Sequence, residues 1–326
     1  MKKQMLIVTS KDDVHSDAVI RHLQNIGKGD DVVRLNTEDI ATNASVSFDG
    51  TDANIQLHDS GRTFNSSQIR SVWFRRPKPI NVLDRDYSSS VQTFISDEWT
   101  AFIRGVYFCM HDSSLWVNPL PSLHRARNKL QQLQLAINLG FAVPNTLVSN
   151  NPEAIARFHD QNDLVCMKTL EKPSYQLAPG EYIPIYTRLV TRTECVSNQA
   201  SLSVSPVLFQ QFIEKIFDVR VIVIGNEIRA FSITPKAGSL AEKDFRHGFS
   251  EGMAYEEIAL PNDISDKIKE FVYAQGLVFS AIDMVVDSSE RMWFLENNAN
   301  GQWLWLEHAT DAPLSAIMAH LLSEGE

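Results

Sequence analysis

Two apolar segments near the C-terminus each carry one carboxylate, and this pair restricts the fold more than any other feature of the sequence. Asp283 lies within residues 279–286, and Glu296 ends the segment 292–296. Because a short polar turn separates two strand-length runs, we predict a β-hairpin in which the carboxylates face one another. Two buried carboxylates repel and lose hydration, so the rest of the chain must supply positive charge or hydrogen-bond donors.

A divalent cation would compensate both carboxylates at once. Asn298 follows Glu296 by two residues and therefore lies on the same face of the strand. The oxygens of Asp283, Glu296 and Asn298 form the hard donor set that Mg²⁺ prefers, with substrate phosphates completing its coordination. Salt bridges from the carboxylates to surface arginines are the alternative that this pattern leaves open.

Basic residues upstream are candidate phosphate contacts. Lys168 lies in the apolar segment 164–170, so its stem can pack inside while its ammonium reaches an anion. Lys129 follows Arg125 and Arg127 at a helix start. Each of these side chains could equally point to solvent, so none identifies a site by itself.

Segment 209–221 joins two apolar strands through a polar turn, and the second strand begins with an Asp-x-Arg pattern. Such a hinge can offer main-chain groups to the edge of a purine. Glu214 can then reach a ribose, and Arg220 can contact a phosphate. The sequence therefore offers a nucleotide-binding surface beside the predicted metal site.

The hydrophobic periodicity predicts an α/β protein. Strands at 4–9 and 31–35 with a helix at 17–26 between them predict a doubly wound unit, followed by strands at 44–48 and 53–57. We place the domains at 1–121, 122–205 and 206–326.

Two elements of the middle part matter for the site. A single helix is predicted over 123–139, and Gly140 can end it in a left-handed conformation. Residues 182–190 alternate as one strand, and Thr191 and Glu194 form a capping box for a short helix after it.

Composition excludes several classes of protein. The 326 residues include 30 Lys and Arg against 40 Asp and Glu, a net charge of −10, which disfavours a nucleic-acid binder. The sequence contains no run of eighteen apolar residues, so we predict no membrane span. The three cysteines are widely spaced, which disfavours a disulfide framework or a zinc site, so we expect reduced thiols in the cytoplasm.

In their order and spacing, the candidate residues as a set resemble those of the ATP-grasp ligases. Within that group, the resemblance is to enzymes near the glutamate-adding ligases. The set consists of Lys129, Lys168, the hinge Gln-Gln-Phe-Ile-Glu ending at Glu214, Asp-Val-Arg ending at Arg220, Asp-Phe-Arg ending at Arg246, Asp283, and Glu296-Asn-Asn298. Further motifs are similar to those of microviridin-type graspetide synthetases, which close side-chain esters or amides in ribosomally made precursor peptides. These motifs are Trp-Phe-Arg-Arg-Pro from Trp73, Trp-Val-Asn-Pro from Trp116, Phe-Ala-Val-Pro-Asn-Thr-Leu from Phe141, and Asn-Gly-Gln-Trp-Leu-Trp-Leu-Glu from Asn300.

This resemblance, which runs from about residue 4 to residue 320, implies an ATP-grasp fold with an N-terminal doubly wound pre-ATP-grasp domain. It implies ATP and Mg²⁺ as cofactors, with Asp283, Glu296 and Asn298 as the metal ligands. Lys129 and Lys168 are then phosphate contacts, and Arg220 and Arg246 neutralise the acyl phosphate and its acceptor. The adenine and ribose contacts implied are Gln211, Phe212, Ile213 and Glu214.

The partner implied is a precursor peptide with a leader and a core. We expect the segment containing Tyr182, Tyr186 and Leu189 to bind the leader, because a strand edge beside a short helix can take a peptide. The alternative is that this segment only covers the ATP site. A homodimer is a further arrangement that the sequence leaves open.

The expected activity is therefore ATP-dependent ligation within a peptide, starting with phosphorylation of an Asp or Glu side chain. An amino-acid ligase of the same fold, which adds glutamate or another amino acid to a protein or small peptide, is the alternative. A non-catalytic ATP-binding module is disfavoured because the carboxylates and lysines are all present.

Overall fold

The N-terminal part is built on a parallel four-stranded sheet. The computed structural model describes residues 4–82, 86–111, 114–171, 174–178, 181–235 and 252–324. In the order of the sheet, the strands are β2 (Val32–Asn36), β1 (Gln4–Thr9), β6 (Ile69–Phe74) and β7 (Leu115–Val117). The helices that accompany them are α1 (Val14–Asn25), the short α2 (Ile40–Asn43) and α3 (Ser89–His111).

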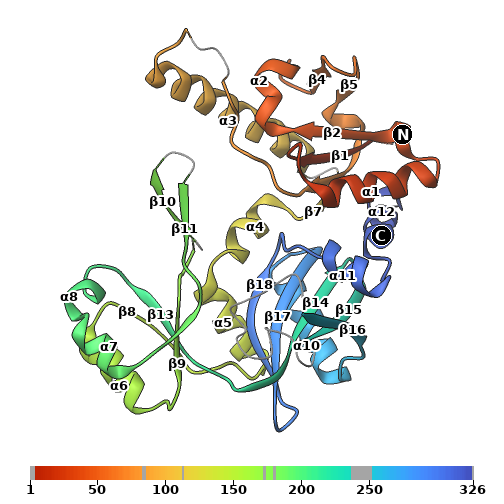
Figure 1. Cartoon of the computed structure of the whole chain (residues 1–326). Coiled ribbons are helices and arrows are strands. Elements are labelled where there is room, and N and C mark those ends of the chain that lie inside the picture. Colours follow the sequence, from red (N-terminus) through yellow and green to blue (C-terminus); the bar gives the residue numbers. More distant parts are fainter. Residues whose placement is uncertain are drawn as a thin grey trace.

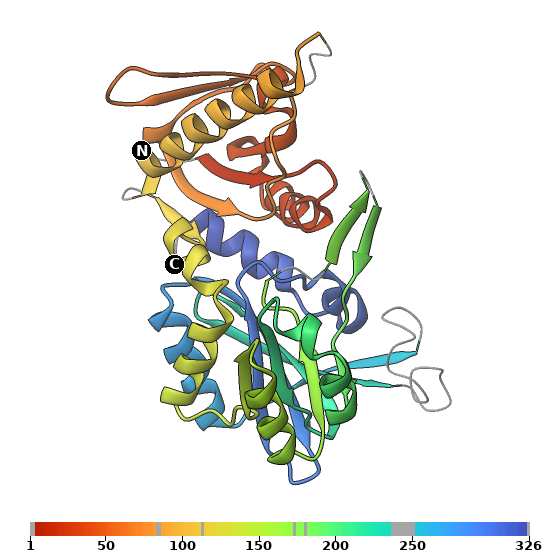
Figure 2. The same cartoon turned by 90° about the vertical axis from the view of Figure 1, so that its left-hand side faces the viewer.

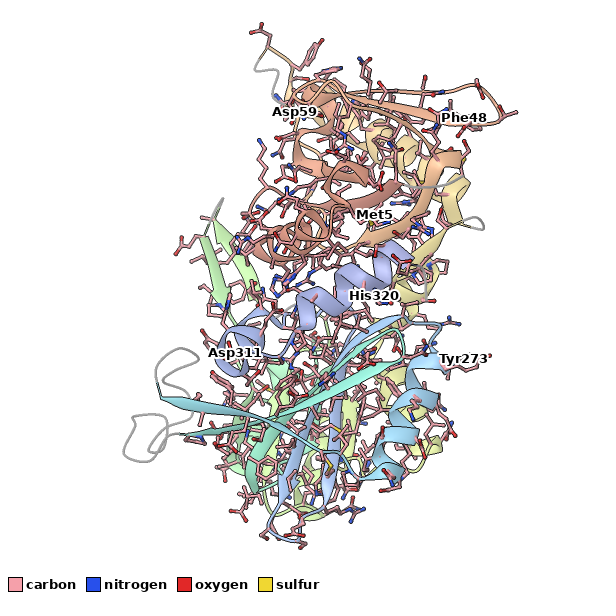
Figure 3. All side chains as sticks on the ribbon, turned by 90° about the vertical axis from the view of Figure 1, so that its right-hand side faces the viewer. Met5, Phe48, Asp59, Tyr273, Asp311 and His320 are labelled. Carbon is pink, nitrogen blue, oxygen red and sulfur yellow. The ribbon has the colours of Figure 1, made fainter. Side chains whose placement is uncertain are left out.

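Both faces of this sheet are covered, as the doubly wound prediction requires. Met5 and Ile7 of β1 pack with α1 and with the C-terminal helix α12 (Leu314–Glu324), whereas Leu6 and Val8 pack with α3. Alternate side chains of a strand point to opposite faces, so a strand covered on both sides must be apolar throughout. Figure 3 shows Met5 inside this part of the molecule.

A small antiparallel sheet adjoins α3. Its strands are β3 (Ala44–Phe48), β4 (Ala53–Leu57) and β5 (Thr63–Asn65). Asp49 stabilises the turn after β3, because its side chain accepts hydrogen bonds from the main-chain N–H groups of Thr51 and Asp52.

The middle part is an antiparallel sheet with helices on one side (Figure 1). In the order of the sheet, its strands are β12 (Arg188–Val190), β9 (Val165–Lys168), β13 (Val207–Gln211) and β8 (Thr146–Ser149). The helices are α6 (Pro152–Asp160), α7 (Arg192–Ser197) and α8 (Gln199–Leu202). A separate hairpin of β10 (Ser174–Ala178) and β11 (Glu181–Pro184) projects away from this sheet (Figure 1).

The C-terminal part is a five-stranded antiparallel sheet. In the order of the sheet, its strands are β16 (Met253–Ile258), β15 (Glu227–Pro235), β14 (Lys215–Ile224), β17 (Phe279–Asp287) and β18 (Met292–Asn298). One face packs on α4 (Leu120–Ala126), α5 (Lys129–Asn138) and α10 (Asn262–Ala274). The other face packs on α11 (Leu304–Thr310) and α12. Because α12 also contacts α1, one hydrophobic core joins the N-terminal and C-terminal sheets, with α12 between them (Figure 2).

Two predicted elements are wrong in the same way, because each is divided in the structure. The helix predicted over 123–139 ends at Ala126 and restarts at Lys129, since Asn128 caps α5 by accepting hydrogen bonds from the N–H groups of Leu130 and Gln131. The end of α5 follows the prediction, with Gly140 at a φ of +75°.

The strand predicted over 182–190 is likewise two strands, β11 and β12, which belong to different sheets. Pro184 ends β11, because a proline has no N–H to continue a ladder. The capping box after β12 is confirmed, with Thr191 and Glu194 each bonding the other's main-chain N–H. The cysteines are unpaired, as expected. Among the described residues, no helix has the length and apolar character that crossing a bilayer requires.

Candidate functional site

The hairpin of β17 and β18 brings the two predicted carboxylates together. Asp283 and Glu296 are directly opposite one another in the register of the two strands. The side-chain amide of Asn298 lies between them, because its Nδ2 donates to Asp283 Oδ2 at 2.9 Å and to Glu296 Oε1 at 3.3 Å. Both carboxylates keep part of their surface, with exposed side-chain fractions of 26% and 36%, so their oxygens are accessible from outside.

Two cations lie beside these carboxylates. Arg220 of β14 is opposite Asp283 in the sheet, and its Nε is 2.9 Å from Asp283 Oδ1. Lys129, the first residue of α5, has its Nζ 3.3 Å from Glu296 Oε2 and also donates to the carbonyl of Thr169. The break between α4 and α5 therefore matters to the site, since it places Lys129 at a helix N-terminus that faces β18.

The environment affects the two carboxyl groups differently. Burial, together with the charge of Glu296, raises the pKa of Asp283 to about 6, against the opposing effect of Arg220. Burial also acts to raise the pKa of Glu296, but Lys129, Asn298 and Lys168 outweigh it and hold that pKa below its usual range. Arg220 thus only partly offsets the burial of Asp283, and a divalent cation bound by the two carboxylates and the side-chain amide of Asn298 would compensate the rest.

Lys168 points into a small polar cavity next to the carboxylates. Its Nζ donates to Oε1 of Gln210 at 2.8 Å, and Gln210 in turn donates to Oγ1 of Thr146. The cavity is lined by Lys129, Gln132, Leu133, Lys168, Leu208, Gln210, Leu295 and Glu296. Lys168, which is partly buried, therefore faces the same space as Lys129 and Glu296.

The predicted nucleotide hinge links the middle and C-terminal sheets. The N–H of Gln211 donates to the carbonyl of Asn145, and the N–H of Phe212 donates to the carbonyl of Leu164, both at 2.8 Å. Ile213 is partly buried and Glu214 is exposed. These contacts hold Gln211–Phe212 against the middle sheet, while Glu214 remains free to face a ligand.

Side chains far away in the sequence hold the end of β18. Gln132 of α5 forms two hydrogen bonds to the main chain of Asn297, at 2.8 and 2.9 Å. Asn118, which follows β7, donates to the carbonyls of Phe279 and Ala299 and accepts from the N–H groups of Val278 and Phe279. These contacts connect the β17–β18 hairpin to α5 and to the N-terminal part.

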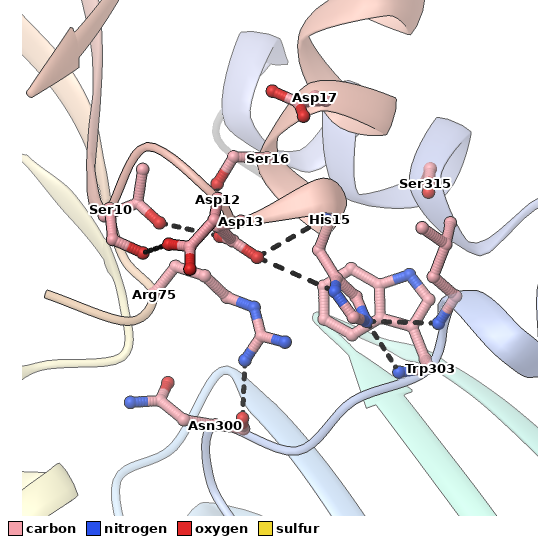
Figure 4. Close-up of polar contacts among 12 residues, drawn as sticks. Ser10, Asp12, Asp13, His15, Ser16, Asp17, Arg75, Asn300, Trp303 and Ser315 are labelled. Atoms are coloured by element: carbon pink, nitrogen blue, oxygen red, sulfur yellow. Dashed lines mark hydrogen bonds and ion pairs between the residues drawn. The ribbon is translucent and has the colours of Figure 1, made fainter. Parts of the chain in front are cut away.

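Two further side chains of the N-terminal part hold the loop that follows Asn298 (Figure 4). Arg75 is 1% exposed, donates to the carbonyl of Asn300, and has its guanidinium 5.2 Å from the centre of the Trp303 ring. The N–H groups of Trp303 and Leu304 donate to Nε2 of His15 at 3.0 and 3.1 Å. A ring nitrogen that accepts two hydrogen bonds belongs to a neutral imidazole with its proton on Nδ1.

Close packing explains the glycine in this loop. A Cβ placed on Gly301 would lie 2.3 Å from Cβ of Ala281 on β17, closer than two carbon atoms can approach. The loop can therefore lie flat against the sheet only with glycine at this position.

The structure thus brings together most of the predicted site residues: Lys129, Lys168, Arg220, Asp283, Glu296 and Asn298, with Gln211–Glu214 at the adjoining hinge. Arg246 lies outside the described residues. Arg125 does not join the cluster, since it donates to the carbonyl of Gln275. Tyr182 lies on β11, Tyr186 in the following loop and Leu189 on β12, with exposed fractions of 62%, 75% and 44%.

Sequence reasoning missed the residues that position the site, which are His15, Arg75, Asn118, Gln132 and Gln210. Arg75 carried one usable signal, because it directly follows the apolar strand β6. Arg75, Asn118 and Gln210 also lie in motifs that carry the family resemblance, but those motifs do not show what the side chains contact. His15 and Gln132 are polar residues in ordinary surroundings, and only the fold shows their contacts.

This architecture is that of an ATP-grasp enzyme. Residues 126–322 match the RimK-like ATP-grasp domain, so the chain belongs to this family of ligases, and residues 4–124 match the MvdD pre-ATP grasp domain. No curated protein sequence matches the chain.

Several solved structures are similar to the whole chain. Macrocyclase MdnC from Microcystis aeruginosa MRC, bound with precursor peptide MdnA, is 26% identical, with 99% of each chain covered and a TM-score of 0.83. A RiPP-associated ATP-grasp ligase from Chryseobacterium gregarium, in complex with ADP and a leader and core peptide, is 25% identical, with 99% of this chain and 97% of that chain covered and a TM-score of 0.84. Macrocyclase MdnB, also from Microcystis aeruginosa MRC, is 26% identical over 99% of this chain and 100% of that chain, with a TM-score of 0.78.

Proposed function

We propose that this chain is an ADP-forming ligase that closes side-chain ester or amide crosslinks within a ribosomally made precursor peptide. The observation that carries this proposal is the similarity over 99% of the chain to a macrocyclase bound with its precursor peptide. The cluster of Arg220, Asp283 and Glu296 with two lysines supplies the charges that such a reaction needs.

The reaction has two steps. A side-chain carboxylate of the peptide attacks the γ-phosphorus of ATP, the bond from that phosphorus to the bridging oxygen breaks, and ADP leaves. A hydroxyl or amino group of the same peptide then attacks the acyl carbon, phosphate leaves, and the proton of the nucleophile passes to phosphate or solvent. Positioning and charge neutralisation supply most of the rate in such transfers.

Each group at the site has a role in this proposal. Asp283, Glu296 and Asn298 hold Mg²⁺, which when bound offsets the charge of the ATP phosphates. Lys129 and Lys168 contact those phosphates from the other side of the cavity. Gln211, Phe212, Ile213 and Glu214 hold the adenine and ribose, and Arg220 with Arg246 neutralises the acyl phosphate.

We also propose where the leader of the precursor binds. Strand β12, which carries the exposed Leu189, lies at the edge of its sheet. The exposed Tyr186 comes just before it, and α7 follows directly after. Tyr182 extends this apolar surface along β11. An edge strand can accept another strand, and the neighbouring apolar side chains can bind the peptide's side chains.

The remaining expectations belong to the same proposal. The division into domains at 1–121, 122–205 and 206–326 is supported by the separate sheets of the three parts. We propose that the ligase acts in the cytoplasm on a peptide and not on nucleic acid, in keeping with a net charge of −10.

Incubation with a precursor peptide encoded beside the gene, ATP and Mg²⁺ tests the function directly. Each crosslink removes one water, so mass spectrometry should show a loss of one or more water masses together with one ADP for each loss. A gain of one amino-acid residue mass, when free amino acids are added, would favour the amino-acid ligase. No ADP with either substrate would contradict both functions, and added EDTA should stop the reaction if Mg²⁺ is required.

A further inference from the structure

The sheet face that carries the predicted metal ligands has a further carboxylate, Asp218, to which the proposed function gives no role. Asp218 lies on β14, the central strand of the C-terminal sheet (Figure 1), two residues before Arg220. Side chains two residues apart on a strand point to the same face. Arg220 is directly opposite Asp283 on β17, so Asp218, Arg220 and Asp283 share one face of the sheet.

The charged groups on this face follow one another in a definite order. Glu296 of β18 is opposite Asp283 of β17, and Asp283 is opposite Arg220 of β14. Asp218 lies further along β14, about 7 Å from Arg220 at the rise of an antiparallel strand. The order therefore runs from the predicted metal ligands to Arg220, which neutralises the acyl phosphate in the proposed function, and then to Asp218.

The surroundings of Asp218 leave it accessible and hold it in place. Its side chain is 34% exposed, and both carboxylate oxygens accept hydrogen bonds from Nζ of Lys215. Asp218 is also close enough to affect Asp283, because burial is the main cause that raises the pKa of Asp283 and the charge of Asp218 acts in the same direction. A carboxylate already bound to an ammonium is poorly suited to hold a divalent cation as well, so Asp218 is not a further metal ligand.

The other described carboxylates of this region have different contacts or roles. Asp283 and Glu296 are the predicted metal ligands, and Glu214 faces the nucleotide at the hinge. Asp287 accepts hydrogen bonds from the main chain of the turn that joins β17 and β18. Asp218 is therefore the described carboxylate beside Arg220 whose oxygens neither the metal nor the nucleotide needs.

We propose that Asp218 is the general base of the second step, and that it accepts the proton of the peptide hydroxyl or amino group that closes the crosslink. This role rests on the proposed function and adds a catalytic residue to it. As the nucleophile attacks, its bond to the acyl carbon forms and the bond from that carbon to the phosphate oxygen breaks. Phosphate leaves with the electron pair of that bond, and the proton of the nucleophile moves to Asp218 and then to solvent.

The chemistry of the second step requires such a group, whereas the first step does not. Attack by a neutral hydroxyl places a positive charge on its oxygen unless a base removes the proton. General base catalysis of this kind typically contributes about 10²- to 10⁴-fold. The first step joins a carboxylate to a phosphorus atom and transfers no proton, so loss of Asp218 should leave formation of the acyl phosphate intact.

Trapping the acyl phosphate separates the two steps. Asp218→Asn keeps the size of the side chain but cannot accept the proton, so crosslinking of the precursor peptide encoded beside the gene should slow at least about a hundredfold. Hydroxylamine reacts with an acyl phosphate without help from a base of the enzyme. When it is added, Asp218→Asn should form the peptide hydroxamate at close to the wild-type rate, as measured by mass spectrometry.

A matched control is Asp266→Asn, which removes the carboxylate of another aspartate–lysine pair with the same sequence spacing, on the exposed side of α10. It should crosslink at the wild-type rate. Asp218→Ala is measured in parallel, so that a folding defect of one substitution does not decide the result. Hydroxamate formation by either variant shows that it is folded and still phosphorylates the peptide.

Two results would overturn the role of Asp218 while leaving the ligase function in place. One is crosslinking by both Asp218 variants at near the wild-type rate. The other is an equal loss of hydroxamate and crosslink in both, because Asp218 would then serve the first step or the structure of the site. A wild-type enzyme that forms neither product would instead contradict the ligase function, and the role of Asp218 with it.

Discussion

The charges around Asp283 and Glu296 determine what the site can hold. Arg220 and Lys129 are each already paired with one of these carboxylates. A nucleotide triphosphate entering the same cavity adds several negative charges, so the two lysines alone leave a deficit of positive charge. A divalent cation on the oxygens of Asp283, Glu296 and Asn298 removes that deficit and uses the hard donors that are present.

Removal of this donor set should abolish ligation. In Glu296→Gln with Asn298→Ala, one carboxylate becomes an amide and the neighbouring amide is lost, so the affinity for Mg²⁺ falls. Changes outside the ligand set typically cost about 10- to 100-fold, and we expect a larger loss of turnover here. Crosslinking of the precursor measures it, with Glu270→Gln on the exposed face of α10 as the control. Near wild-type turnover in the double variant would refute the metal assignment.

Lys168 should contribute to nucleotide binding. Lys168→Met keeps the length of the side chain but removes the charge that faces Lys129 and Glu296 across the cavity. Loss of one charge-assisted hydrogen bond corresponds to about tenfold or more in affinity.

Calorimetric titration with a nonhydrolysable ATP analogue provides the measurement for Lys168. Lys267→Met, which removes an ion pair on the surface of α10, is the matched control. Unchanged affinity in Lys168→Met would mean that the ammonium only orients Gln210.

Charged residues within apolar strands could be picked out from the sequence as candidate site residues. The residues that form hydrogen bonds to the main chain around them could not. Asp283, Glu296 and Lys168 are conspicuous in the sequence because each interrupts a run of apolar residues. By contrast, Gln132 and Asn297 are 165 residues apart, and Arg75 and Asn300 are 225 apart. Such contacts depend on how whole sheets meet, which no local pattern records.

At the scale of the element, hydrophobic periodicity predicted several strands correctly but missed the positions at which a helix or strand is interrupted. Strands β1, β3 and β4 begin and end at the predicted residues, because in each the apolar pattern is bounded by clear turn signals. The break at Asn128 was missed, since a polar residue inside an amphipathic pattern reads equally well as the exposed face of one helix. The prediction of one strand over 182–190 extended across Pro184, because the residues on both sides of this proline are partly apolar.

The segment from β11 to α7 should bind the precursor leader independently of ATP. In Tyr186→Asp with Leu189→Asp, two exposed apolar contacts are replaced by charges. We expect KM for the precursor to rise at least about tenfold while KM for ATP changes little, because the lost contacts are remote from the reacting carboxylate. Steady-state kinetics with each substrate varied in turn measures the two constants.

Amide exchange gives a second readout for the same segment. Residues 182–200 should gain protection when leader peptide alone is added, without ATP. Tyr273→Asp, which adds one negative charge at an exposed aromatic position, serves as the control. Equal effects on both substrates, or no protection by the leader, would place the peptide elsewhere.

At the scale of the whole molecule, the N-terminal part is a structural component of the site. Helix α12 packs on both large sheets. Three side chains of the N-terminal part, His15, Arg75 and Asn118, hold the chain that follows β18. The position of Asn298 therefore depends on the contact between the two parts. The N-terminal part thus positions the loop that follows Asn298.

His15 makes this contact sensitive to pH. Burial lowers the pKa of His15, against the opposing effect of Asp13, whose Oδ1 is 3.6 Å from Nδ1, while the charges of Arg75 and Arg76 lower it further. In the unfolded chain the imidazole has its usual pKa of about 6.5. The unfolded state therefore binds more protons than the folded state below that pH, so the contribution of His15 to stability is present above about pH 6.5 and is lost as the pH falls.

His15→Gln should reduce this pH dependence, because a glutamine oxygen can accept from Trp303 and does not titrate. The wild type should lose up to about 1.4 kcal/mol more stability than the variant for each pH unit below about pH 6. Urea unfolding at pH 7.5 and pH 5.5 measures the difference, with His320→Gln on the exposed side of α12 as the control (Figure 3). If the wild type and His15→Gln lose stability equally on acidification, His15 is protonated in the folded enzyme, and the hydrogen bonds from Trp303 and Leu304 do not hold the loop as described.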